Sequence, residues 1–183
     1  MTWIIVLAVV AALLGAAFIL LYNRLVRLRN RTDNAWAQVD VQLKRRYDLI
    51  PNLVETVKGY AAHETGTFQA VVEARNAAQA AQGVEEQAAA ENILTGALRK
   101  LFALAEAYPE LRASENFQAL QAQLAETEDK IAISRQIYND STLSLNNAVQ
   151  TIPTNIVASL AGFSTRAYFE LEGEERSAPQ VEF

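Results

Sequence analysis

The chain has no cysteine and only one histidine among its 183 residues. The lack of cysteine excludes disulfide bonds, thiolate metal sites and a cysteine nucleophile. His63 is followed by Glu64, but no second histidine lies four positions further on, so the helical zinc-protease motif is absent. A carboxylate-bridged two-metal centre in a helical bundle takes a histidine from each of two helices, which one histidine cannot supply. We therefore expect no catalytic residue, no metal site and no cofactor.

Glycine and proline are scarce, at seven and four residues. Between them, apolar residues recur every three or four positions, which is the spacing of one face of a helix. No stretch alternates apolar and polar residues over the length of a strand, so no sheet is predicted. The pattern predicts an all-α protein, with an N-terminal transmembrane helix followed by an antiparallel up-and-down bundle of about four long helices.

Charged side chains are missing from the twenty residues between Trp3 and Tyr22. Twenty helical residues rise about 30 Å, which matches the hydrocarbon thickness of a bilayer. Trp3 and Tyr22 stand at the two ends of the run, and aromatic rings favour both membrane interfaces. The alternative, a cleaved signal peptide, would have a basic N-terminal region and a shorter apolar stretch. We expect residues 1–22 to be a single-pass membrane anchor.

Positive charge follows the apolar run directly, at Arg24, Arg27, Arg29 and Arg31. Because basic residues beside a span stay in the cytoplasm, we expect the N-terminus outside the plasma (inner) membrane and the rest of the chain in the cytoplasm. Residues 1–46 hold seven basic and two acidic residues, whereas residues 47–183 hold nine basic and nineteen acidic ones. The basic end suits a lipid bilayer with anionic headgroups, and the acidic remainder argues against a nucleic-acid partner.

A basic juxtamembrane stalk is predicted at residues 23–32, a helical bundle domain at 33–171 and a mobile acidic tail at 172–183. The first bundle helix is predicted over residues 33–62, with the anchor helix running into it. Pro51 should kink this helix near residues 49–52, because proline removes a backbone donor and crowds the Tyr47 carbonyl. Residues 64–67 are predicted to form the turn into a second helix that begins at Phe68.

Three further segments complete the predicted bundle. Gly83 is expected to separate the second helix from a third, which stops at Pro109. The fourth helix is expected to be the longest, from Ser114 or Glu115 to Pro153. A closing segment, residues 155–171, should then bend at Gly162 and fold back onto the bundle through five apolar residues: Ile156, Leu160, Phe163, Tyr168 and Phe169.

The kinked turn around Pro51 is the candidate partner surface, made of Asp48, Pro51 and Asn52. A backbone carbonyl freed by the proline and the Asn52 amide would there be available to another protein. The alternative is a kink whose polar groups are satisfied within the bundle. In the anchor, small residues at positions 8, 12 and 16 allow close approach of a second transmembrane helix, which leaves a homo-oligomer open.

Charged and amide residues also occur together on two predicted helices. The first helix carries Asp40, Arg45, Arg46, Asp48, Asn52 and Glu55, and the fourth carries Glu126, Glu128, Asp129, Arg135, Asn139 and Asp140. Paired carboxylates can act as acid and base when a pocket separates their pKa values. Ion pairs between neighbouring helices use the same residue types. We therefore favour a structural polar network that sets the register of the helices.

A series of sequence blocks occurs in order along nearly the whole chain: Tyr22–Asn30, Asn34–Val54, Val57–Ala61, Ala107–Leu111, Glu115–Phe117, Thr127–Ile131, Tyr138–Asp140 and Gly162–Phe163. This series resembles the LemA family of bacterial membrane proteins. One departure is the presence of Leu145 and Ile152 where the family more often has aromatic residues. The resemblance implies a single-pass membrane protein with an antiparallel helical bundle, and it implies no defined reaction or catalytic residues.

Together these features predict a non-enzymatic, membrane-tethered scaffold or adaptor for a protein partner in the cell envelope. The alternative is an accessory subunit of a membrane protease, or a hydrolase that uses bundle carboxylates such as Glu128 or Asp129.

Overall fold

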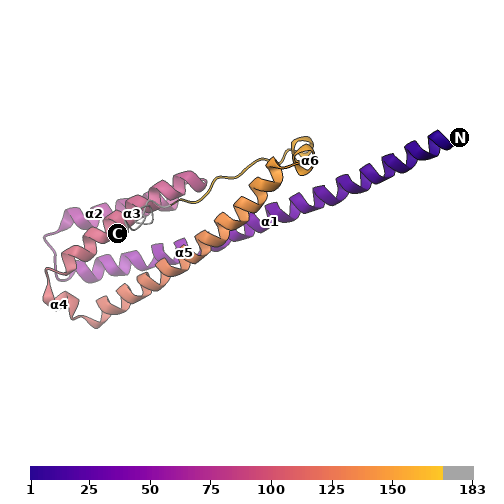
Figure 1. Cartoon of the computed structure of the whole chain (residues 1–183). Helices are drawn as coiled ribbons and strands as arrows, with labels where there is room; N and C mark the ends of the chain where they lie inside the picture. Colours follow the sequence, from indigo (N-terminus) through magenta and orange to yellow (C-terminus); the bar gives the residue numbers. More distant parts are fainter. Residues whose placement is uncertain (171–183) are drawn as a thin grey trace, which may run out of the picture. The chain divides into compact units, whose positions relative to one another are not determined.

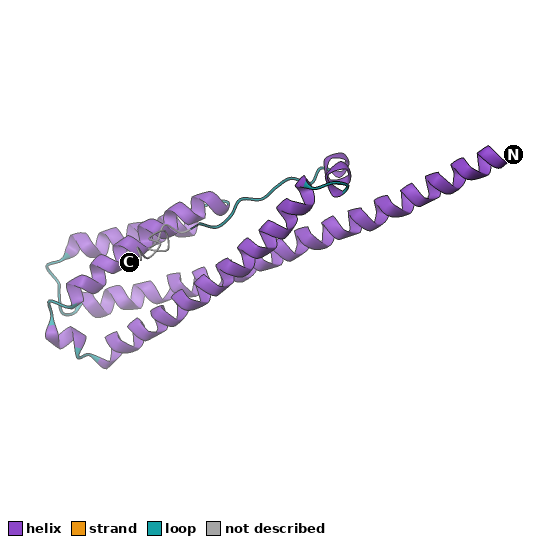
Figure 2. Ribbon diagram, viewed as in Figure 1, coloured by secondary structure: helices purple, strands orange, loops and turns teal. Residues whose placement is uncertain are grey.

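The computed structural model of the chain describes residues 1–170; the acidic tail predicted at residues 172–183 lies outside the described residues. Figure 1 shows the helices in chain order: α1 (Thr2–Lys58), α2 (Thr65–Ala80), α3 (Val84–Ala105), α4 (Pro109–Arg112), α5 (Glu115–Gln150) and α6 (Thr154–Ala161). No strand occurs among residues 1–170 (Figure 2). The prediction of an all-α chain, with a long apolar N-terminal helix followed by a helical bundle, is confirmed.

Helix α1 joins the apolar run to the bundle without interruption, over 57 residues. Its first part, residues 2–20, is exposed throughout and is long and apolar enough to cross a membrane. Leu25 is the first buried residue, so helix packing begins just after the apolar run ends, within the predicted stalk. Helix α1 also continues through Pro51 and ends at Lys58, four residues before the predicted end.

The chain divides into two compact units, each of which contains parts of α1 and α5. The first unit comprises residues 1–40 and 133–168. The second comprises residues 41–132 and, among the described C-terminal residues, 169 and 170.

In the first unit, α1 and the second part of α5 run antiparallel. The rings of Trp36 and Tyr138 lie 5.1 Å apart, and further along Leu25 packs against Ala148. Helix α6 adds Val157 and Ala158 to this cluster, and partly buried Leu21, Leu28, Val149 and Phe163 pack around it. This packing brings α6 to the level of α1 at which the apolar run ends.

In the second unit, the last part of α1, the hairpin of α2 and α3, and the first part of α5 surround a core of aliphatic residues and alanines. Its buried members include Leu43, Ile50, Leu53, Val71, Leu94, Leu101, Leu124 and Ile131. Gly83 separates α2 from α3 as predicted, with a φ of 84° that side chains disfavour. The many alanines of α2 allow close packing, since Ala74 and Ala78 are both buried.

Two predicted boundaries were wrong. Helix α2 begins at Thr65, so residues 65–67 form its first turn instead of a connecting turn. Helix α3, which was predicted to stop at Pro109, ends at Ala105, and Pro109 is the first residue of α4. Proline suits a first helical position because the backbone N–H that it lacks would have no partner within the helix there.

The C-terminal predictions also need correction. Helix α5 ends at Gln150, three residues before Pro153, and α1 is longer than α5. Gly162 does end α6, with a φ of 71°, and the Phe163 N–H then bonds to the Ala158 carbonyl at 2.9 Å. Of the five apolar residues expected to pack, Phe169 is buried and Phe163 half-buried, Tyr168 is 38% exposed, and Ile156 and Leu160 face solvent.

Candidate functional site: a buried polar network and its groove

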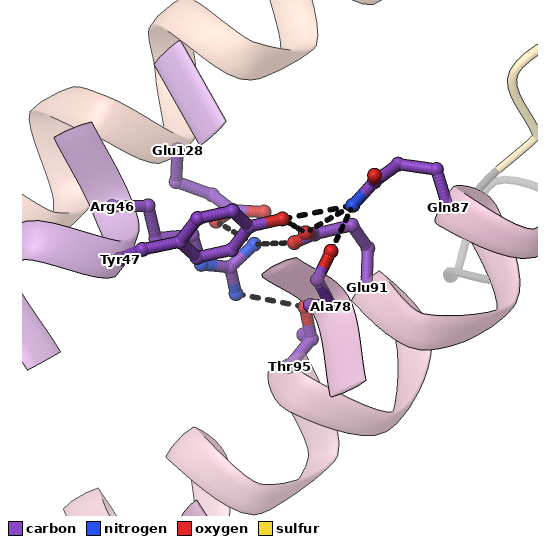
Figure 3. A network of polar contacts seen from close by, with 7 residues as sticks. All are labelled: Arg46, Tyr47, Ala78, Gln87, Glu91, Thr95 and Glu128. Atoms are coloured by element: carbon purple, nitrogen blue, oxygen red, sulfur yellow. Dashed lines mark hydrogen bonds and ion pairs between the residues drawn. The ribbon is translucent and has the colours of Figure 1, made fainter. Parts of the chain in front are cut away.

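The second unit contains a network of polar side chains that connects three helices (Figure 3). Arg46 Nη1 lies 3.2 Å from an oxygen of Glu91 and 3.2 Å from an oxygen of Glu128. Arg46 Nη2 donates to the Thr95 hydroxyl at 2.8 Å. Since Arg46 is on α1, Glu91 on α3 and Glu128 on α5, one guanidinium group links all three helices.

The spacing of the residues on α3 explains how the network forms. Gln87, Glu91 and Thr95 are four positions apart and therefore share one face of the helix. Tyr47, the neighbour of Arg46 on α1, donates its hydroxyl to the second oxygen of Glu91. Each carboxylate oxygen of Glu91 is thus held by a donor from α1, which aligns the two helices along their axes.

Gln87 extends the network to the end of α2. Its amide nitrogen lies 3.1 Å from the Ala78 carbonyl, 2.8 Å from the Tyr47 hydroxyl and 3.1 Å from Glu91. In Figure 3, dashed lines connect this nitrogen to all three acceptors. The amide therefore fixes the α2–α3 hairpin to α1 and satisfies a carbonyl near the end of α2 that has no helical donor.

Burial controls the ionisation of this network. The side chains of Arg46 and Glu91 are 3% and 0% exposed. Burial raises the pKa of the Glu91 carboxyl above its ordinary value, while the contacts from Tyr47, Arg46 and Gln87 oppose the rise. Burial and the adjacent Glu91 raise the pKa of the Tyr47 hydroxyl, so Tyr47 keeps its proton and remains a donor.

A groove of about 250 Å³ borders the exposed side of the network. Arg46, Thr95 and Glu128 contribute its polar wall, and Glu128 is 48% exposed. The remaining lining residues are mostly apolar or uncharged: Leu98, Arg99, Phe102, Gln121, Leu124 and Ala125. The groove thus combines an apolar floor with charges of both signs, a composition that suits a protein side chain or a short peptide segment.

The carboxyl groups near the groove differ in their burial and in their partners. Burial raises the pKa of the Glu91 carboxyl, and the same complete burial separates it from any molecule in the groove. Glu128 faces the groove and is paired with Arg46, and Asp129 is exposed on the surface of α5. Within residues 1–170, no group of three or more histidine, aspartate or glutamate side chains is arranged to hold a metal ion.

The predicted partner surface, Asp48, Pro51 and Asn52, is exposed in the second unit. The Tyr47 carbonyl, which Pro51 deprives of its helical donor, instead accepts a hydrogen bond from Arg75 Nε at 2.8 Å. Because Arg75 belongs to α2, the polar group freed by the proline is satisfied within the bundle. The three side chains themselves remain accessible.

The predicted membrane-interface residues lie in the first unit. Trp3 and Tyr22 are 80% and 40% exposed, and all four arginines are exposed: Arg24, Arg27, Arg29 and Arg31. The Arg29 guanidinium lies 5.2 Å from the centre of the Phe163 ring. Arg27 and Arg31 line a separate groove of about 370 Å³ between α1 and α5, together with Asn30, Asn34, Ala35, Gln38, Ile137 and Ser141.

Sequence reasoning included Arg46 and Glu128 among twelve candidates for a register-setting network, but it missed Glu91, Gln87 and Thr95. A signal for Glu91 was present, because it stands three positions before Leu94 and continues the apolar stripe of α3. A lone acidic residue on a buried stripe indicates a buried ion pair. The partner of Glu91 is 45 positions away along the chain, and sequence spacing does not reveal such a contact.

Comparisons with known proteins find relatives that match most of the chain. The chain is 26% identical to the magnetosome protein MamQ 2 of Paramagnetospirillum magneticum, across 90% of this chain and 70% of that protein. It is 27% identical to the protein LemA of Metamycoplasma hominis, across 84% of this chain and 71% of that protein. The model of the LemA family matches residues 35–183, which include the whole polar network. The chain therefore belongs to the LemA family.

Proposed function

We propose that the protein is a membrane-anchored, non-enzymatic scaffold or adaptor that holds another envelope protein beside the membrane. The observation that carries the proposal is helix α1. One uninterrupted helix leads from an exposed apolar segment into the buried network around Arg46. A continuous helix transmits position better than a flexible linker, because its backbone hydrogen bonds resist bending.

The anchor is proposed to span the membrane once, with the N-terminus outside and the helical units in the cytoplasm. Support comes from Arg24, Arg27, Arg29 and Arg31, which follow the apolar run directly, and from the exposure of residues 2–20. The chain has no native cysteine, so single cysteines at Thr2 and Gln136 can be compared. A membrane-impermeant maleimide applied to spheroplasts should label Thr2→Cys and leave Gln136→Cys unlabelled until the membrane is opened.

Two surfaces of the second unit are proposed for the partner: the exposed face of Asp48, Pro51 and Asn52, and the groove beside Glu128. A non-enzymatic role is supported because Glu91, the carboxyl whose pKa is raised by burial, is engaged by neighbouring side chains and closed off from the groove. The groove offers apolar contact area around Phe102 and Leu98 with polar groups at its edge, which is the common composition of a protein-binding surface.

Photo-crosslinking in native membranes tests the proposal. A photoreactive residue is placed in the full chain at Asn52 or Ala125, with Glu85, at the exposed start of α3, as the matched control. A discrete adduct with one envelope protein is expected from Asn52 or Ala125 and not from Glu85. Adducts only between copies of the chain would replace the adaptor with a homo-oligomeric scaffold. Equal adducts at all three positions, or none, would contradict both assignments.

A further inference from the structure

Helix α6 exposes an unusual amount of apolar side chain. Ile156 and Leu160 are 58% and 74% exposed, and Ile152, in the turn before the helix, is 81% exposed. Ile156 and Leu160 are four positions apart on α6 and therefore share one face of the helix. We call these two residues, together with Ile152 in the preceding turn, the outer face of α6. An exposed stripe of large aliphatic residues indicates a contact surface.

The opposite face of α6 is held firmly against α1. Val157 and Ala158 are 4% and 1% exposed and pack with Leu25. After the bend at Gly162, the Phe163 ring meets the Tyr22 ring edge-on, with the ring centres 5.9 Å apart. These contacts fix the distance of α6 from the end of the apolar run, because Tyr22 is the last residue of that run and Leu25 lies about 5 Å beyond it along the helix axis.

The direction of α6 relative to α1 is consistent with a position at the membrane surface. In Figure 2, α1 runs across the view while α6 is seen nearly end-on, so α6 lies across α1. If α1 crosses a membrane, a helix that lies across it at the level of Tyr22 is close to the plane of the membrane surface. An apolar stripe on such a helix lies at the depth of the boundary between the headgroups and the acyl chains.

Positive charge accompanies the stripe. Arg29 lies over the Phe163 ring at 5.2 Å, and Arg24 and Arg27 are exposed on the same stretch of α1. Aliphatic side chains that enter the acyl boundary beside arginines at the headgroup level are typical of helices that bind anionic membranes. The three aliphatic residues are too few to supply the roughly 800 Å² per partner that a stable protein interface buries.

We propose that α6 is a second membrane contact, whose outer face, Ile152, Ile156 and Leu160, inserts into the surface of the same bilayer that α1 spans. The inference rests on the proposed membrane anchoring. It gives the protein two attachments to one membrane, a spanning helix and a surface helix, joined through Leu25 and Phe163. Two attachments restrict the tilt and the rotation of α1 in the bilayer, which a single span leaves free.

Depth-dependent fluorescence quenching tests this contact in the full chain, reconstituted in vesicles of phosphatidylcholine and phosphatidylglycerol. An environment-sensitive fluorophore is attached to single cysteines at Ile156→Cys or Leu160→Cys, both exposed and therefore tolerant of substitution. Gln136→Cys, exposed on α5 in the same unit, is the aqueous control, and Leu13→Cys reports on the span. Lipids carrying a quencher near the headgroup should quench positions 156 and 160 several-fold more than position 136, with blue-shifted emission.

The outcomes separate the two proposals. Quenching at Leu13→Cys by deep-labelled lipids, with positions 156 and 160 no more quenched than 136, would overturn the surface contact and leave the anchor intact. Lack of quenching at Leu13→Cys would overturn the anchor itself. Blue-shifted emission at Leu160→Cys without lipid quenching, accompanied by crosslinks between copies, would assign the stripe to a second copy of the chain and overturn the lipid contact.

Discussion

The two units of the molecule hold their helices together with different chemistry. In the second unit, charged and polar side chains meet each other, with Arg46 between Glu91 and Glu128. In the first unit, neutral side chains bond to the main chain of the closing segment. The Asn146 amide donates to the Arg166 carbonyl at 2.9 Å and accepts from the Arg166 N–H at 2.8 Å, and the Tyr138 hydroxyl donates to the Ala167 carbonyl at 2.9 Å.

The difference follows from what each unit must attach. Neighbouring helices satisfy their own backbone groups, so only side chains are available to set their register. The closing segment after Gly162 is not helical, and its free N–H and C=O groups need partners from elsewhere. An asparagine suits that task because its amide carries a donor and an acceptor together. The buried contacts of the second unit are therefore sensitive to charge, and those of the first are sensitive to the loss of neutral hydrogen bonds. The ion pair of the first unit, between Arg166 and Asp33, is partly exposed.

The largest expected effect comes from Arg46→Met, which keeps an aliphatic chain but leaves Glu91 buried without its cation. Removal of one partner from a buried ion pair costs about 3–5 kcal/mol. Hydrogen exchange of the full chain in detergent micelles should show faster exchange in α3, with the closing segment unchanged. The matched control is Arg45→Met, on the exposed side of α1, which should change little.

Removal of both charged partners separates the effect of the buried charge from the effect of side-chain packing. In the double variant Arg46→Met/Glu91→Leu, no buried carboxyl remains, so most of the protection of α3 should return. If the double variant exchanged as fast as Arg46→Met alone, the loss would come from packing of the arginine side chain and not from the uncompensated charge.

A smaller effect is expected in the first unit from Asn146→Ala. It removes both hydrogen bonds to Arg166 and leaves the main-chain groups of the closing segment without these partners, at a cost of about 1–3 kcal/mol. Exchange should accelerate at the Arg166 amide and its neighbours while α3 is unaffected. Asn147→Ala, the next and exposed residue on α5, is the control. Equal acceleration in both variants would contradict the role of the Asn146 amide.

The smallest expected effect is a pH dependence confined to the second unit. Because burial raises the pKa of Glu91 in the folded chain, the folded state holds this proton more tightly than the unfolded state. The contribution of Glu91 to stability is thus greatest below its unfolded pKa of about 4.5 and decreases as the pH rises toward its raised folded pKa. Urea midpoints of the wild type and of Glu91→Gln should be measured from pH 4 to pH 8. As the pH rises, the midpoint of the wild type should fall relative to that of Glu91→Gln.

A control of opposite sign is available on α5. The Lys130 ammonium beside Glu126 lowers the pKa of this exposed carboxyl, so any stabilisation from Glu126 is lost as the pH falls. Glu126→Gln should therefore show a weak trend in the other direction. A pH trend of the same sign in both variants would contradict the assignment of the trend to buried Glu91.

The long helices were predictable because periodic apolar residues dominate their packing. Residues such as Val39, Leu43, Ile50 and Val57 lie on one stripe of the sequence, and all are buried. The errors fell at helix ends and in the closing segment. Ile156 and Leu160 have the spacing of core residues, but whether an apolar stripe meets protein or another medium depends on the neighbours that the fold places beside it.

The candidate site was predictable only in part. Arg46 and Glu128 were recognisable as charges on facing helices, and the carbonyl freed by Pro51 was foreseen from proline chemistry. The hydrogen bond that this carbonyl accepts from Arg75, 28 positions away, was not foreseen. The contact of Glu91 with both Arg46 and Tyr47 was equally hidden, since hydrogen bonds between distant residues depend on the axial offset of helices, which local propensity does not specify.

The sequence by itself determined the features that depend on neighbours along the chain. These are the helical content, the apolar run before Tyr22, the basic residues after it and the breaks at Gly83 and Gly162. Only the tertiary structure decided which apolar stripes were buried, that the Glu91 carboxyl was buried and where α6 came to lie. The physical reason is range: helix formation and chain breaks depend on a few consecutive residues, whereas burial depends on segments that meet only after the chain has folded.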